Sequence, residues 1–133
     1  MKTKILLFIC VVCLSGSALA ADKDKMTDEQ KEAMQARVKE LNATCDYPQK
    51  PSIPDGRNST KDDMLKAQAR MKAFIKDGNN YIDCLDNVEK GWGDKATNND
   101  HALVVVLHNK AVDDMQSVAD LFNAAVRAYK GKK

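Results

Sequence analysis

Two cysteines and the proline-rich segment between them constrain the fold of this chain more than any other feature. Beyond residue 20 the only cysteines are Cys45 and Cys84, and Pro48, Pro51 and Pro54 follow the first cysteine at three-residue intervals. A pair of cysteines in an oxidising compartment predicts a disulfide, and their spacing is not that of a Cys-x-x-Cys redox motif. A bridge between them would fix the path of the intervening chain.

Residues 1–20 have the features of a secretory signal peptide. Lys2 and Lys4 precede a short apolar stretch over residues 5–14, and residues 18–20 read Ala-Leu-Ala, a cleavage signal of small residues. The stretch is shorter than the ~20 apolar residues of a membrane-spanning helix. We therefore expect cleavage after the signal, which also removes the other two cysteines, and no membrane insertion of the mature chain.

The charges of the mature chain are balanced. The full sequence has 21 Lys and Arg residues against 19 Asp and Glu residues, and the signal takes two of the basic ones. The net charge of residues 21–133 is thus about zero, which gives no support to binding of nucleic acid or of an anionic membrane. A chain of this length predicts one domain.

Two long stretches have the three- and four-residue apolar spacing of amphipathic helices. We expect helices over residues 60–90 and 98–130, the first ending at Gly91. The turn between them is short, so they should form an antiparallel hairpin. Folding about this turn places Leu85 near Leu103 and Gly78 near Ala111.

A shorter helix is expected over residues 27–43, with Thr27 as its N-cap. Its apolar stripe is narrow and consists of Met34, Val38 and Leu41. A helix with so little apolar surface should dock weakly against the hairpin.

The lengths of the segments predict where the proline-rich segment, residues 44–58 (the strap), runs. The helix from Thr60 to Cys84 is about 36 Å long at 1.5 Å per residue. The chain from Cys45 to Thr60 spans about 46 Å when extended. Because bridged Cα atoms lie only ~5.5 Å apart, the strap must run antiparallel along the second helix, with Ile53 as its main apolar contact. The predicted fold is all-α, a hairpin with a short N-terminal helix and a disulfide-bonded strap.

Some of these residues form a pattern of the type Cys…Pro-x-x-Pro-x-Ile-Pro-Asp-Gly…Tyr-x-x-Cys-Leu within residues 45–85. Its elements are Cys45, Pro48, Pro51, Ile53-Pro54-Asp55-Gly56, Thr60, Met64, Phe74 and Tyr81-Ile82-Asp83-Cys84-Leu85. The pattern resembles small secreted proteins of proteobacteria, a group without an established function. The resemblance implies an envelope location and paired cysteines, and it transfers no catalytic residue.

Residues able to carry chemistry are few and poorly arranged for it. His101 and His108 are ~10.5 Å apart along a helix, too far to share one metal ion. The carboxylate pairs Asp62-Asp63 and Asp113-Asp114 are chain neighbours, which diverge by about 100° on a helix. We expect the first pair to cap its helix and the second to be mostly solvated. The sequence predicts no catalytic residue, metal or cofactor.

Trp92 lies between two glycines at the predicted tip of the hairpin. Exposed, it could anchor a partner, since tryptophan is enriched at binding hot spots. Alternatively it folds over the end of the hairpin, beside Cys84 and the first helix, and this second interpretation is the one we favour.

The function predicted is that of a periplasmic or secreted, non-enzymatic helical module for binding or assembly. Its partner would be an unknown envelope protein or a second copy of the chain. Two alternatives remain open: a small enzyme with a site at His108, and a carrier that holds an apolar ligand between the hairpin and the first helix.

Overall fold

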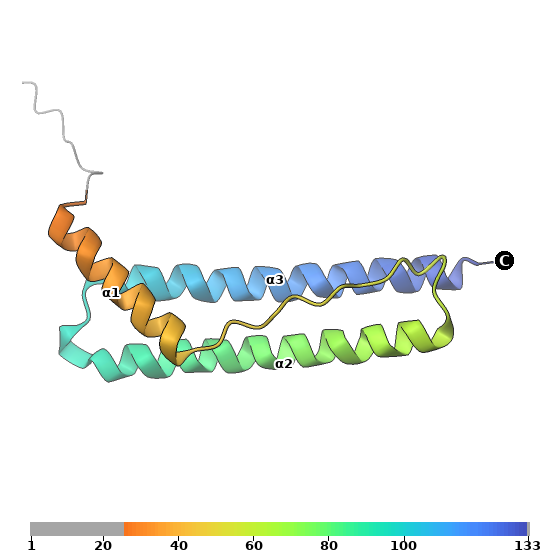
Figure 1. Ribbon diagram of the computed structural model, residues 1–133, viewed down its shortest axis with the longest axis horizontal. Coiled ribbons are helices and arrows are strands. Elements are labelled where there is room, and N and C mark those ends of the chain that lie inside the picture. Colours follow the sequence, from red (N-terminus) through yellow and green to blue (C-terminus); the bar gives the residue numbers. More distant parts are fainter. Residues whose placement is uncertain (1–25, 133) are drawn as a thin grey trace, which may run out of the picture.

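The computed structural model describes residues 26–132 and shows an all-α protein built on one long hairpin (Figure 1). Its elements are α1 (Asp28–Thr44), α2 (Lys61–Trp92), the short 3-10 helix η1 (Gly93–Lys95) and α3 (Asn98–Lys130). The predicted all-α hairpin with a short N-terminal helix and a disulfide-bonded strap is confirmed. The predicted signal peptide lies outside the described residues.

Threonine side chains start all three α-helices. Thr27, Thr60 and Thr97 are the N-caps, and each takes part in a reciprocal capping box with the residue three positions later. In each box the cap hydroxyl accepts a hydrogen bond from a backbone N–H that has no partner within the helix. The partners are Gln30, Asp63 and Asp100.

The predicted end of this helix at residue 90, with Gly91 as its stop, is two residues too early, because α2 continues through Trp92. Gly93 is the residue that ends it, with a positive φ of 52°. A side chain rarely adopts that backbone conformation, so the second glycine rather than the first turns the chain into η1.

A seven-residue repeat runs through the hairpin. In α2, Met64, Gly78, Leu85 and Trp92 are buried at intervals of seven or fourteen residues. In α3 the buried series is Val104, Ala111, Val118 and Ala125. This is the spacing of two helices that pack side by side along their whole length, and small residues in both series let the backbones approach.

At mid-hairpin the side chain of Met115, one turn after Ala111 on α3, fills the space at Gly78. A Cβ placed on Gly78 would lie 2.5 Å from Sδ of Met115. Helical side chains lean toward the N-terminus of their own helix, so the long Met115 side chain reaches back and fills the space above the glycine. Gly78 thus accommodates the Met115 side chain, and the expected proximity of Gly78 to Ala111 stays a prediction.

Two apolar clusters form the core, one at each end of the hairpin. The cluster near the tip joins α1 to the hairpin and comprises Leu41, Cys45, Tyr81, Leu85, Trp92, Val104 and Ala111. The cluster at the open end comprises Met64, Ala67, Phe122 and Ala125, and Ile53 of the strap packs against it. The predicted role of Ile53 is therefore confirmed.

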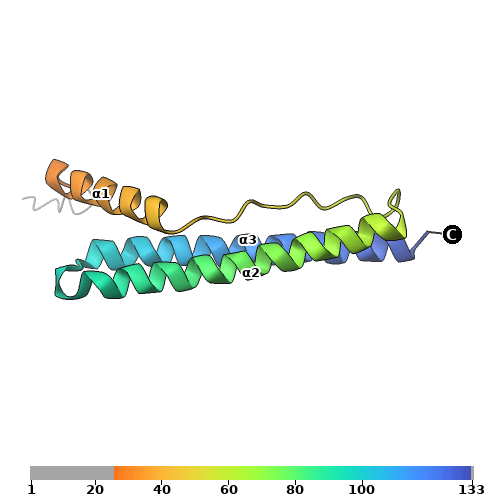
Figure 2. The ribbon, with the colours of Figure 1, turned by 60° about the horizontal axis from the view of Figure 1, so that its bottom comes forward.

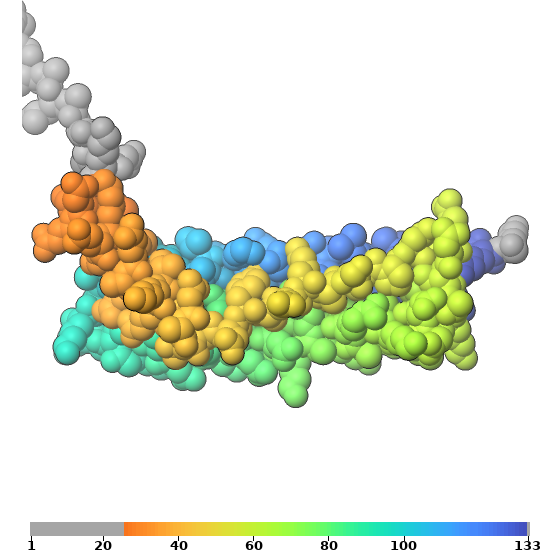
Figure 3. All heavy atoms as spheres, in the orientation of Figure 1, coloured from red at the N-terminus to blue at the C-terminus, as the bar shows by residue number. Residues whose placement is uncertain are grey.

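Both α1 and the strap lie on one side of the hairpin (Figure 2). In the space-filling view they cover the groove between α2 and α3 from the tip to the open end (Figure 3). Among residues 26–132, no helix is both long and apolar enough to cross a membrane.

Only one residue of the predicted apolar stripe of α1 is buried against the hairpin. Leu41 is its only buried residue, whereas Val38 is 36% exposed. Met34 and Val38 line an open hollow on α1 together with Asn42. Beside Leu41, the side of α1 that meets the hairpin carries the polar residues Arg37 and Glu40.

Candidate functional site

The disulfide pins the start of the strap to α2. Cys45 and Cys84 are bonded, with Cα atoms 5.7 Å apart and a sequence separation of 39. Cys45 is 3% exposed and belongs to the tip cluster. The bridge therefore joins the end of α1, the strap and the hairpin at one buried point.

The strap is held next by a polar contact with α3, which sequence reasoning missed. Asp114 accepts hydrogen bonds from the Tyr47 hydroxyl at 2.6 Å and from Nζ of Lys50 at 2.9 Å. Nζ of Lys110 donates a third hydrogen bond at 2.8 Å and lies 4.8 Å from the centre of the Tyr47 ring. The strap thus contacts α3 as well as α2, a finer placement than the prediction gave.

Asp114 is the charge at the centre of this contact and is not mostly solvated as expected, since its side chain is 22% exposed. The hydrogen bonds from Lys110, Tyr47 and Lys50 hold the pKa of its carboxyl far below the usual 3.8. Burial, then the same carboxylate, raises the pKa of the Tyr47 hydroxyl. Asp114 is ionised throughout the neutral range and binds the strap as an anion.

Acid is expected to release the first half of the strap. A depressed pKa contributes stability that is present above the unfolded value of 3.8 and is lost as the pH falls toward the folded value. Amide NMR shifts of Tyr47 and Lys50 should therefore move below about pH 4. The Asp114→Asn variant should already show displaced shifts at pH 7, a stability lower by about 1 kcal/mol and no such acid transition. Identical titrations of the two proteins would contradict this role.

The far end of the strap lies directly against α3. A Cβ placed on Gly56 would lie 1.7 Å from the backbone oxygen of Ala125 and 2.9 Å from the nitrogen of Tyr129. Only glycine fits at such a distance. Asp55 stabilises the turn that follows, because its carboxylate accepts hydrogen bonds from the Arg57 N–H and the Asn58 amide.

The prolines space the strap between these two ends. Pro48, Pro51 and Pro54 lie in a segment without regular secondary structure, from Asp46 to Asp55. Proline keeps such a segment extended and donates no backbone hydrogen bond. Along this stretch Nη2 of Arg70 on α2 reaches the Ser52 carbonyl at 3.4 Å. The strap therefore runs antiparallel to α2, as predicted, while it crosses toward α3.

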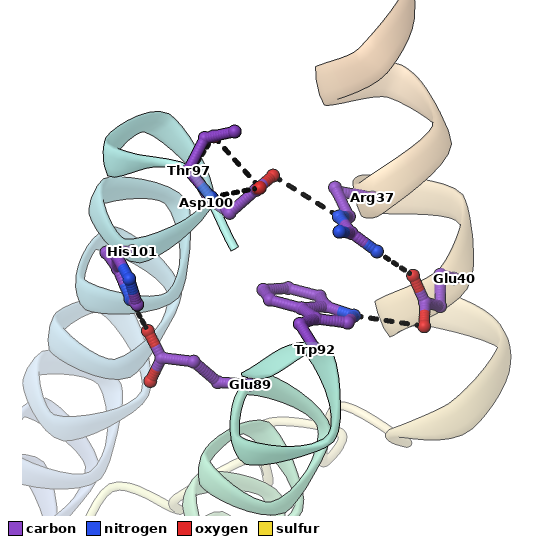
Figure 4. A network of polar contacts seen from close by, with 7 residues as sticks. All are labelled: Arg37, Glu40, Glu89, Trp92, Thr97, Asp100 and His101. Carbon is purple, nitrogen blue, oxygen red and sulfur yellow. Dashed lines mark hydrogen bonds and ion pairs between the residues drawn. The ribbon is translucent and has the colours of Figure 1, made fainter. Parts of the chain in front are cut away.

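Trp92 joins the tip of the hairpin to α1 (Figure 4). Its Nε1 donates a hydrogen bond to Glu40 at 3.1 Å, and the Arg37 guanidinium lies 4.3 Å from the ring centre. The residue is 7% exposed. The interpretation of Trp92 as an exposed partner anchor is therefore wrong, and contact with the first helix is correct.

Arg37 links this tryptophan to the start of α3 (Figure 4). It donates to Glu40 at 3.0 Å and to Asp100 at 3.3 Å. The Trp92 hydrogen bond and then Arg37 lower the pKa of Glu40. Burial alone would raise the pKa of Asp100, but hydrogen bonds from Thr97 and the charge of Arg37 outweigh it and lower the pKa. These polar contacts thus add to the docking of α1 through Leu41.

The two histidines have separate surroundings. Nδ1 of His101 lies 2.6 Å from Oε1 of Glu89, on the exposed surface near the tip. His108 is half-buried, the core-edge position that was expected. Within residues 26–132, no cluster of three or more His, Cys, Asp or Glu side chains could hold a metal ion.

A carrier that holds an apolar ligand between the hairpin and α1 would need an apolar cavity there. The hollow in this place lies between α1 and the tip of the hairpin. Arg37, Glu40, Lys95, Thr97 and Asp100 line it together with two alanines. Such a lining favours water and ions rather than an apolar molecule. No observation on His108 or on this hollow favours the enzyme or carrier alternatives.

The hairpin carries apolar residues on the side opposite the strap as well. They form a row beside the buried residues of the seven-residue repeats, and the sequence alone did not distinguish them from the core. On α3 each of these residues comes one position after a buried residue of the seven-residue repeat, and on α2 they come one position after the buried Phe74 and Tyr81. Val105 is 56% and Val112 42% exposed, and the others are half-buried. We call this set the open row: Ile75, Ile82, Val105, Val112, Ala119 and Val126.

Helix geometry places the open row away from the strap. Consecutive residues of an α-helix are rotated by about 100°, so residues two apart are rotated by about 200°. Lys110 contacts the strap, and Val112 is two residues later. Cys84 is bonded to the strap, and Ile82 is two residues earlier. Helix geometry thus turns Ile82 of α2 and Val112 of α3 away from the strap.

Comparison of the chain with protein-family models, with curated proteins and with solved structures found no significant match. The resemblance to small secreted proteobacterial proteins therefore stays a prediction.

Proposed function

We propose that this protein is a non-enzymatic binding or assembly module of the bacterial periplasm or the secreted fraction, and that a partner docks on the open row. The supporting observation is the asymmetry of the hairpin. The strap, the disulfide and α1 all lie on one side, while Val105 and Val112 stay exposed on the other.

The pattern of the open row is typical of helices that pack on more than one neighbour. Two helices that pack only against each other need two apolar positions in every seven residues. Helices of a larger bundle carry a third, beside the first two. In α3 the third apolar position of the seven-residue repeat is occupied by Val105, Val112, Ala119 and Val126. This indicates a contact that a lone hairpin does not make.

The covered side supports the same function by keeping the hairpin rigid. The disulfide, the Asp114 contact and the Trp92 contact hold the strap and α1 at several points along one groove. A preorganised surface loses less conformational entropy on binding. A disulfide is also typical of proteins that work in an oxidising compartment, in keeping with the predicted signal peptide.

A photo-crosslinking amino acid placed in living cells tests this function. Introduced at Val112, it should form a covalent adduct with a partner on illumination. Introduced at Val106, it should form none, because Val106 lies on the same helix and is 63% exposed but is outside the open row. Adduct formation at both positions or at neither would contradict the proposal.

A further inference from the structure

We infer that the partner on the open row is a second copy of this chain, turned antiparallel so that the two hairpins form a four-helix bundle. This inference rests on the proposed function and names its partner. The straps and α1 helices would then lie on the two outer sides of the bundle. Three features of the described residues carry the inference: the size of the face, its neutral centre and its charged ends.

The face is large enough for a stable dimer. α2 has 32 residues, which gives a face about 48 Å long, and two neighbouring helices of ~10 Å diameter make it about 20 Å wide. The product, about 1,000 Å² per copy, reaches the ~800 Å² per partner of a typical stable interface. Neither α1 nor the strap needs to move to expose it, because both are on the other side (Figure 2).

The centre of the face is free of charge. From Ile75 to Ile82 on α2 and from Val105 to Ala119 on α3, the positions at seven-residue intervals are all apolar. His108 and Met115 flank this row on α3 and are half-buried. A face of this composition can be buried against an identical one without leaving an unpaired charge.

The two ends of the face carry opposite charges. Toward the tip, Asp86 and Glu89 follow Ile82 by four and seven residues, which places them on the same side of α2. Toward the open end, Lys130 follows Val126 by four residues, and Lys61 precedes Ile75 by fourteen. The face is therefore acidic at the tip, apolar in the middle and basic at the open end.

This order of charges selects both the partner and its direction. A parallel pair would bring the acidic tips together and the basic ends together, which is unfavourable. An antiparallel pair related by a two-fold axis brings each acidic tip against the basic open end of the other copy. The surface is then complementary to itself.

Sedimentation equilibrium of the oxidised mature chain tests the pairing. The wild type should have the mass of two copies, and so should the control Val106→Glu. Val112→Glu should raise the dissociation constant at least about 100-fold, because symmetry buries the new carboxylate twice. A wild type that keeps the mass of one copy up to about 1 mM overturns the inference. So does a Val112→Glu variant that pairs as well as the control.

Charge exchange tests the direction. Making the tip basic with Asp86→Lys and Glu89→Lys should raise the dissociation constant about tenfold or more, and making the open end acidic with Lys61→Glu and Lys130→Glu should do the same. The chain that carries all four changes should pair as the wild type does, since each altered end meets the other altered end. Failure of this rescue overturns the antiparallel arrangement. Far-UV circular dichroism checks that each variant is folded.

The two proposals fail in different ways. A crosslinked adduct at Val112 with the mass of two copies supports both. An adduct of another mass, together with a wild type that sediments as one copy, overturns self-pairing and leaves the binding function standing. The absence of any adduct specific to Val112, with a single-copy mass, overturns both.

Discussion

Replacing Cys45 and Cys84 together with serine is expected to lower the free energy of unfolding by about 4 kcal/mol, the largest effect of any change considered. The bridge closes a segment of 39 residues, and without it the unfolded chain gains the entropy of that loop. The loss should be local before it is global. α1 and the strap contact the hairpin at separate points, whereas α2 and α3 pack along their length.

Limited trypsin digestion with and without reductant measures this order of events. Cleavage after Arg57 in the strap and after Lys39 in α1 should become fast on reduction or in the double-serine variant. Over the same conditions far-UV circular dichroism should lose only the signal of α1 and keep that of the hairpin. Unchanged protection of Arg57 after reduction would show that the bridge does not hold the strap, contrary to the structure.

Substituting Gly56 with alanine is expected to have the next largest effect, a loss of about 2–3 kcal/mol. The new Cβ would lie 1.7 Å from the Ala125 oxygen, which is helix backbone and cannot rotate away. The strap must therefore lift from α3 at this end. Ile53, three residues earlier, would lose part of its burial in the open-end cluster.

Two other glycines provide matched controls in urea unfolding. A Cβ on Gly91 would meet nothing within 4 Å, so Gly91→Ala should raise stability by ~0.5–1 kcal/mol through helix propensity. Gly78→Ala should cost less than Gly56→Ala, because the atom it meets is Sδ of the flexible Met115 side chain. Equal effects of Gly56→Ala and Gly91→Ala would contradict the close approach of strap and α3.

The fold could be predicted because its main constraints are local or follow from lengths. Apolar periodicity defines the two long helices, and the distance from Thr60 to Cys84 leaves the strap one path. The exact end of α2 could not be predicted, since Gly91 and Gly93 are equivalent in sequence. Only their backbone angles distinguish them.

The contacts that hold the strap could not be predicted because they depend on register. Asp114 is a typical solvent-exposed residue until Tyr47 and Lys50 are placed beside it. The one signal in the sequence is Lys110, four residues before Asp114, which marks a helix face bearing an ion pair.

The open row was missed for a related reason. Periodicity shows that Val105 and Val112 belong to a helix, but not which side the strap covers. Once Cys84 and Lys110 are known to contact the strap, the apolar residues two positions away from each must face the other side. A third apolar position in each seven-residue repeat of α3 was the signal that could have indicated a further contact.

The central claim, that the open row is a covered binding surface in the working protein, is tested most directly on the unaltered chain. A soluble paramagnetic reagent broadens the methyl NMR signals of side chains that water reaches. In an extract of the cells that produce the protein, we expect strong broadening for Val106 and shielding for Val105 and Val112, although the lone chain exposes all three, at 63%, 56% and 42%. Equal broadening of the three valines would contradict it.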